Sequence, residues 1–193
     1  MKKICLLTIL AVVIHICHPL NLYAGSNGNI KQVPVYNLPI EVPAASQLLS
    51  EILRISGLED EFELKEANVS NLEASISHGK KYILYNPEYI DWLNKLTKNK
   101  WATLTLLAHE VGHHVHGHTK HRSGSKPKLE LQADEFAGSI LYQLGATLEE
   151  TQEVMYHIAK VKRSKTHPSR SSRLDALEKG WNRAAGFEDV ANR

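Results

Sequence analysis

Residues 101–118 read WATLTLLAHEVGHHVHGH, and the rest of the chain is best understood outward from this stretch. Its first half is apolar, which is typical of a helix that is buried on most of its surface. Its second half places His109 and His113 one helical turn apart, so that both imidazoles lie on the same face. Two such nitrogens can converge on one Zn²⁺, and Glu110 can reach a metal-bound water without being a ligand. The stretch therefore predicts a metal-binding helix.

A second polar pair follows in the segment LELQADE, residues 129–135. Glu130 and Asp134 are again one helical turn apart. One carboxylate can bind zinc, and the next can accept the free N–H of a ligand histidine, which fixes the tautomer of that histidine. Glu135 is the alternative to Asp134, but its side chain points about 100° further round the helix. A catalytic tetrahedral site needs a third protein ligand, and this segment can supply it.

Capping residues and apolar spacing predict the helices. Asn86 and Pro87 open one helix, Thr147 and Glu150 form a capping box at another, and Gly57 and Gly145 end two more. We expect helices over residues 44–56, 86–98, 100–116 and 127–144, a helix that begins at 147, and a last helix over 169–184.

The strands are predicted between the first two helices. Residues 82–85 (YILY) give the strongest β signal, and the stretch 72–85 reads as two strands joined by a turn at His78-Gly79. Phe62 and Leu64 alternate with acids and indicate a short strand, while prolines make residues 33–40 extended. A small N-terminal β-sheet followed by a mainly helical half is an α+β fold.

Residues 1–24 resemble a secretory signal peptide, with Lys2 and Lys3 before an apolar run and Ala24 before the expected cleavage. The apolar run of residues 4–17 is shorter than the roughly 20 residues that a membrane span needs. A lipoprotein signal has small residues just before its modified cysteine. Ile14, His15 and Ile16 precede Cys17, which disfavours such a signal. We therefore expect an exported protein, periplasmic or secreted, in which residues 25–193 form a single domain with no membrane span.

Charge and cysteine content exclude several classes of function. The leader contains two lysines and no acids, so residues 25–193 carry equal numbers of basic and acidic residues. A neutral balance argues against a nucleic-acid-binding protein. Both cysteines, Cys5 and Cys17, lie in the leader. The mature chain therefore has no disulfide, no cysteine ligand and no cysteine nucleophile.

Three blocks of the chain resemble the gluzincin zinc metallopeptidases, in particular the CaaX prenyl protease and HtpX-like branch. They are residues 109–118, residues 130–138, and Thr166-His167-Pro168 with Arg173-Leu174, in that order. The resemblance implies that His109, His113 and Glu130 bind one zinc per chain and that Glu110 is catalytic. It also implies that Asp134 supports a ligand. The named enzymes are multi-span membrane proteins, so this chain resembles a small soluble, exported member.

The resemblance carries further expectations. It implies a zincin-like fold, in which an edge strand packed on the helical half lies above the metal helix. Such a strand can hold an extended peptide by main-chain hydrogen bonds. We expect residues 81–85 to be either that edge strand or an ordinary core strand. It implies that His167 donates to the oxyanion, the alternative being an exposed loop histidine. Arg173 can pair with an acid near the site, with a substrate carboxylate, or with neither.

The expected activity is that of a zinc metalloendopeptidase acting on peptides or unfolded protein. The alternatives are a non-catalytic zinc protein, a His-rich metal buffer, and a subunit that needs a regulatory protein partner. The remaining histidines of the motif region do not extend the ligand face, and we interpret them mainly as polar residues at a helix C-terminus, with a second metal site as the alternative. They are His114, His116, His118 and His121.

Overall fold

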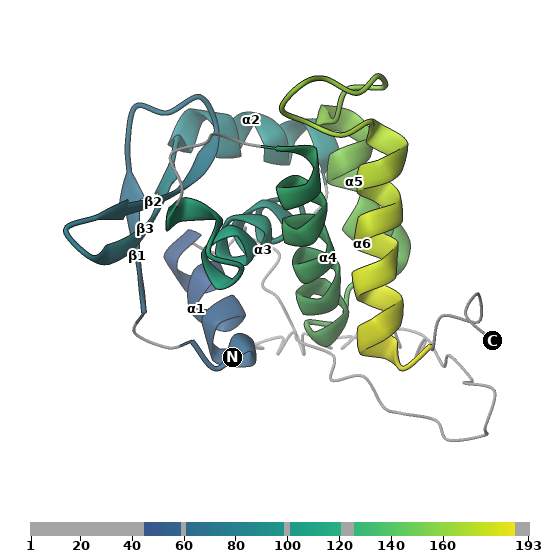
Figure 1. Cartoon of the computed structure of the whole chain (residues 1–193), viewed down its shortest axis with the longest axis horizontal. Coiled ribbons are helices and arrows are strands. Elements are labelled where there is room, and N and C mark those ends of the chain that lie inside the picture. The colour runs from purple at the N-terminus through teal and green to yellow at the C-terminus, as the bar shows by residue number, and fades with distance from the viewer. Residues whose placement is uncertain (1–44, 59–60, 99–100, 121–125, 188–193) are drawn as a thin grey trace, which may run out of the picture. The chain divides into compact units, whose positions relative to one another are not determined.

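The computed structural model describes residues 45–58, 61–98, 101–120 and 126–187 (Figure 1). Within these ranges six α-helices and a three-stranded mixed sheet form an α+β fold that is mostly helical, as predicted. The helices are α1 (Ala45–Ser56), α2 (Pro87–Thr97), α3 (Ala102–Val115), α4 (Pro127–Gln143), α5 (Leu148–Ile158) and α6 (Arg170–Ala185), with a 3₁₀ turn η1 (His118–Lys120). The strands are β1 (Phe62–Glu66), β2 (Leu72–Ser77) and β3 (Lys80–Tyr85). The predicted leader and the extended segment 33–40 lie outside the described residues.

The caps predicted from the sequence form as expected. The Asn86 side chain accepts hydrogen bonds from the backbone N–H groups of Glu88 and Tyr89 at the start of α2. Thr147 and Glu150 make both bonds of a capping box at the start of α5. These bonds satisfy N–H groups that have no partner within the helix, so a short polar signal determines where each helix begins.

The sheet has the strand order β1-β3-β2, with β1 parallel and β2 antiparallel to β3. The predicted turn at His78-Gly79 is confirmed, with φ angles of 49° and 78°. Of the two expectations for residues 81–85, the edge strand is wrong and the core strand is confirmed, because these residues lie in β3 between β1 and β2. Their apolar run reflects burial at the centre of the sheet, where Ile83 is fully buried. β2 is the edge strand that contacts α3.

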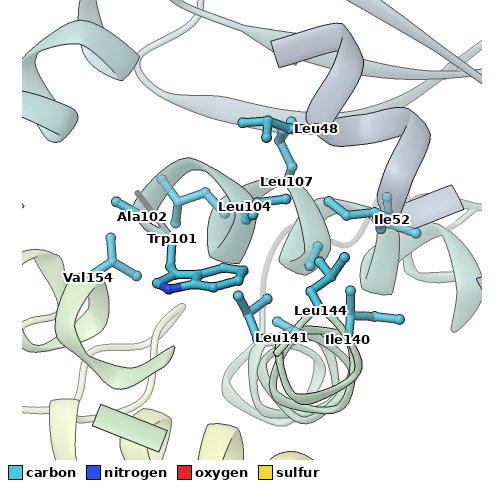
Figure 2. Close-up of a cluster of buried hydrophobic side chains, with 14 of the residues drawn as sticks. Leu48, Ile52, Trp101, Ala102, Leu104, Leu107, Ile140, Leu141, Leu144 and Val154 are labelled. Atoms are coloured by element: carbon cyan, nitrogen blue, oxygen red, sulfur yellow. The ribbon is translucent and has the colours of Figure 1, made fainter. Parts of the chain in front are cut away.

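Helix α3 lies at the centre of the hydrophobic core. Figure 2 shows its residues Leu104 and Leu107 beside Leu48 and Ile52 of α1 and Leu141 of α4. The side chains of α3 are buried from Ala102 to His109, and Val111 and His114 in the next turn are buried as well, so the turn that carries the candidate ligands is itself part of the packed interior. The core thus fixes the helix backbone that carries the candidate ligands. No helix in the described ranges combines the length and apolar character needed to cross a membrane.

Two helix crossings require glycine. A Cβ atom on Gly112 of α3 would lie 3.1 Å from the Cα atom of Ala133 on α4. A Cβ atom on Gly180 of α6 would overlap the carbonyl oxygen of Glu135 on the other side of α4. Helix α4 therefore packs almost backbone to backbone against both α3 and α6. This close packing brings three helices to one site.

Candidate metal centre

The three predicted ligands come together with their donor atoms facing one another. Nε2 of His109 lies 3.1 Å from Nε2 of His113. The two carboxylate oxygens of Glu130 each lie 3.5 Å from one of these nitrogens. Tetrahedral zinc with bonds of 2.0–2.1 Å holds its ligand atoms about 3.3 Å apart. The three groups therefore have the separation that a single metal ion of this size requires, and His109 and Glu130 are each only 5% exposed.

Asp134 contacts the first ligand from behind. Its Oδ1 lies 2.8 Å from Nδ1 of His109, so that Nδ1–H donates to the carboxylate and Nε2 faces the other ligands. Arg173 of α6 donates from Nε and Nη2 to the two oxygens of Asp134, at 2.7 and 2.6 Å. Arg173 was expected to pair either with an acid near the site or with a substrate carboxylate, and it pairs with an acid near the site. Glu135, the alternative to Asp134, instead forms surface ion pairs with Lys179 and Arg183.

The charges of this cluster balance one another in the metal-free protein. Burial opposes protonation of His109, but the carboxylates of Asp134 and Glu130 outweigh it and raise the histidine pKa to about 9. Burial alone would raise the pKa of Asp134, whereas His109 and Arg173 hold it below its ordinary value. Two carboxylates thus face Arg173 and one protonated histidine. A cation that displaces this proton finds a site with two acids already in place.

Glu110 is held by the main chain of the edge strand. Its Oε2 accepts a hydrogen bond of 2.7 Å from the backbone N–H of Ala74 in β2. Burial raises the pKa of Glu110 above its ordinary range, while the charges of His109 and His113 oppose this shift. A raised pKa makes a carboxylate a stronger proton acceptor, which suits a group that takes up and later releases a proton.

Sequence reasoning missed the contacts of two further histidines. His118 lies with Nδ1 2.9 Å from Nδ1 of His113 and with Nε2 3.2 Å from Oε1 of Gln132. His114 is buried, and its Nε2 donates to the carbonyl of Tyr82 in β3 at 2.8 Å. The interpretation of these residues as polar groups at a helix end is wrong for His114, which is buried, and does not account for the contacts of the partly buried His118; burial lowers the pKa of each. Only the exposed His116 fits it, and His121 lies outside the described residues.

His167 lies apart from this cluster. It is exposed in the loop before α6, where the contacts that the structure describes for it are local, to Thr166 and Ser164. The third block of the sequence therefore contributes Arg173 to the site, and the structure does not bring His167 to the ligands.

The arrangement can hold one divalent cation on three protein ligands, with the buried carboxyl group of Glu110 beside it. Its parts come from α3, α4, α6 and β2, which no single segment of the sequence contains. The chain matches no family model, no curated protein and no solved structure, so its chemistry is inferred from its own residues.

Proposed function

We propose that this chain is an exported zinc-dependent endopeptidase of the gluzincin type. The observation that carries the proposal is the group of His109, His113 and Glu130, whose donor atoms are separated as zinc ligands are, with the buried Glu110 next to it in the same helix. A purely structural zinc site would not need that buried acid. The proposed export rests on the leader in the sequence.

The donor set favours zinc as the metal. Two imidazole nitrogens and one carboxylate are a ligand set of catalytic zinc sites, which keep a fourth position open. Zinc bound there would supply Lewis acidity, which favours ionisation of a water near Glu110 and polarises a substrate carbonyl. Asp134 keeps the proton of His109 on Nδ1, so that Nε2 is available to the metal.

Glu110 moves the proton in the proposed hydrolysis. Its Oε2 is held by Ala74, which leaves Oε1 to accept a proton from the attacking water. The water oxygen bonds to the carbonyl carbon, and the bond from that carbon to the amide nitrogen breaks. Glu110 delivers the proton to the departing nitrogen, so that an acid and an amine are released. The raised pKa of Glu110 suits both transfers.

The edge strand β2 offers a surface for an extended peptide. The N–H of Ala74 points away from β3, toward Glu110, and hydrogen-bonding directions alternate along an antiparallel strand. The N–H of Ile76 therefore points the same way. A peptide that pairs with this edge would add a strand beside the metal centre, as in a zincin-like fold. The proposed substrates are peptides or unfolded proteins, and a regulatory protein partner remains part of the proposal.

The test uses residues 25–193, purified without a tag. We expect one zinc per chain by elemental mass spectrometry and cleavage of a peptide library and of a denatured protein. Glu110→Gln is expected to keep the zinc and lose hydrolysis, while Glu135→Gln, a change of the same kind at a surface pair, keeps both. One zinc without hydrolysis in the unmodified chain would indicate a non-catalytic or partner-dependent zinc protein. Several ions per chain would indicate a metal buffer.

A further inference from the structure

His113 has a partner on each side of its imidazole ring. Its Nε2 faces His109 and Glu130, in the candidate metal centre. Its Nδ1 faces the opposite way and lies 2.9 Å from Nδ1 of His118 in η1. Nε2 of His118 in turn lies 3.2 Å from Oε1 of Gln132 on α4. His113, His118 and Gln132 form a chain of contacts that leads from the candidate metal centre back to the helix that carries Glu130.

The direction of the hydrogen bonds in this chain is determined at one end. The amide oxygen of Gln132 can only accept, so Nε2 of His118 carries a proton and donates it. A neutral imidazole with a proton on Nε2 has a lone pair on Nδ1, so His118 accepts the hydrogen bond from Nδ1–H of His113. Nε2 of His113 then has no need of a proton and presents its lone pair to the metal centre.

We propose that His118, oriented by Gln132, is a positioning residue that fixes the tautomer of His113 for metal binding. This proposal rests on the proposed function, because that function supplies the zinc ion that His113 would bind. Under this proposal the two candidate ligand histidines donate their Nδ1–H hydrogen bonds to different kinds of acceptor. His109 donates to the carboxylate of Asp134, whereas His113 donates to a neutral imidazole. It also links the turn after α3 to α4, because η1 and Gln132 belong to different elements.

The geometry around His118 supports a fixed orientation of its ring. The ring of His116 stacks on it at 5.5 Å between centroids, with the planes inclined by 22°. His116 also meets the ring of Phe136 on α4 edge-on. His118 is therefore held by packing as well as by two hydrogen bonds, which is what a residue that orients a metal ligand requires.

The first experiment needs no metal. Long-range ¹H–¹⁵N spectra of the metal-free protein report which ring nitrogen of each histidine carries the proton. We expect the proton of His113 on Nδ1 and that of His118 on Nε2, and we expect Gln132→Leu to remove the preference at His118. A proton on Nε2 of His113 in the unmodified protein would overturn the inference. This result is independent of whether the chain binds zinc or cleaves peptides, so the proposed function can fail separately.

The second experiment measures zinc affinity by competition with a chromophoric chelator. His118→Ala is expected to weaken zinc binding about 10- to 100-fold, the usual effect of removing the partner of a metal-binding histidine. His118→Asn places an amide oxygen close to the position of Nδ1, so it is expected to restore most of the affinity. His157→Ala removes an exposed histidine of α5, outside the candidate metal centre, and should bind zinc as the unmodified chain does. Equal affinity of His118→Ala and the unmodified chain would contradict the proposal.

Discussion

Arg173 on α6 binds both carboxylate oxygens of Asp134 on α4, at 2.7 and 2.6 Å, while Asp134 accepts a hydrogen bond from Nδ1–H of His109 on α3. Asp134 is fully buried and Arg173 is 7% exposed. One buried ion pair therefore connects α6 to α4, and the hydrogen bond from His109 extends this connection to α3, the helix that carries the first proposed ligand. The residue that supports a metal ligand also contributes to the packing of three helices.

This relationship predicts a large loss of stability when Arg173 is removed. Arg173→Ala leaves the carboxylate of Asp134 buried without its cation, which costs about 3–5 kcal/mol in other buried pairs. Arg173→Lys keeps the charge but cannot donate two bonds in the fork geometry, so its loss should be intermediate. Urea unfolding of the metal-free protein measures both. Arg183→Ala breaks the exposed pair with Glu135 between the same helices and should cost about 1 kcal/mol or less. Equal losses at Arg173 and Arg183 would show that the buried pair has no special role.

Asp134 and Glu135 provide a matched pair of variants for the metal centre. Asp134→Asn keeps the shape of the side chain but weakens the acceptor of His109, so zinc affinity is expected to fall about 10- to 100-fold. Glu135→Gln changes an acid one residue further along α4 that pairs with Lys179 and Arg183 at the surface. It should leave zinc affinity within about twofold of the unmodified chain, because such exposed pairs contribute little. A larger loss of zinc affinity in Glu135→Gln than in Asp134→Asn would show that Glu135, not Asp134, supports the metal centre.

Most of the secondary structure could be predicted because its signals are local. The caps at Asn86 and Thr147 and the turn at His78-Gly79 each act through bonds or φ angles within a few residues. The order of the strands depends on contacts between distant parts of the chain, so the sequence could not decide whether residues 81–85 form an edge strand or a core strand. The apolar residues of this strand indicate burial, which is complete at Ile83, but they do not show which strands lie next to it.

The same distinction applies to the site. His109, His113, Glu130 and Asp134 could be predicted because helical spacing puts each pair on one face. His118 could not, because it lies beyond the end of α3 in η1, where that spacing no longer applies. The support of Glu110 by Ala74 also could not be predicted, since it depends on a backbone group of an edge strand rather than on any residue type.

The raised pKa of His109 predicts that the metal-free protein loses stability at alkaline pH. Its pKa is about 9 in the fold and about 6.5 in an unfolded chain. The stabilisation from the protonated ring is therefore complete below about pH 6.5 and is lost as pH rises through about 9. Urea unfolding between pH 6 and 10 measures this loss. The measurement is best made in the Glu110→Gln variant, because Glu110 is a buried acid whose own raised pKa would also contribute to the pH dependence. Asp134→Asn should flatten the profile. A flat profile with Asp134 intact would contradict the prediction.

The close contact between α6 and α4 at Gly180 leads to a prediction about how tightly these helices must pack for the site to form. In Gly180→Ala the new methyl group would overlap the backbone carbonyl of Glu135, which cannot move aside as a flexible side chain would. We expect a loss of about 3 kcal/mol in the free energy of unfolding, at the upper end of typical overpacking costs. Zinc affinity should fall as well, because α6 carries Arg173. Glu178→Ala, at an exposed position of the same helix, is the control and should change neither quantity.

His167 and Glu110 are expected to differ sharply in their effect on catalysis. The resemblance assigns His167 to the oxyanion, but the structure places it in an exposed loop with local hydrogen bonds. If the loop keeps this position with substrate bound, His167→Ala should lower kcat by less than about tenfold and leave zinc content unchanged, because removal of a true oxyanion donor costs about 10²–10³ in kcat. Glu110→Gln removes the proton carrier and should lower kcat by about 10² or more at unchanged zinc content. Steady-state cleavage of one peptide from the library measures both. A loss of 10² or more in kcat for His167→Ala at unchanged KM would show that the loop closes over the metal centre during the reaction and that His167 touches the substrate.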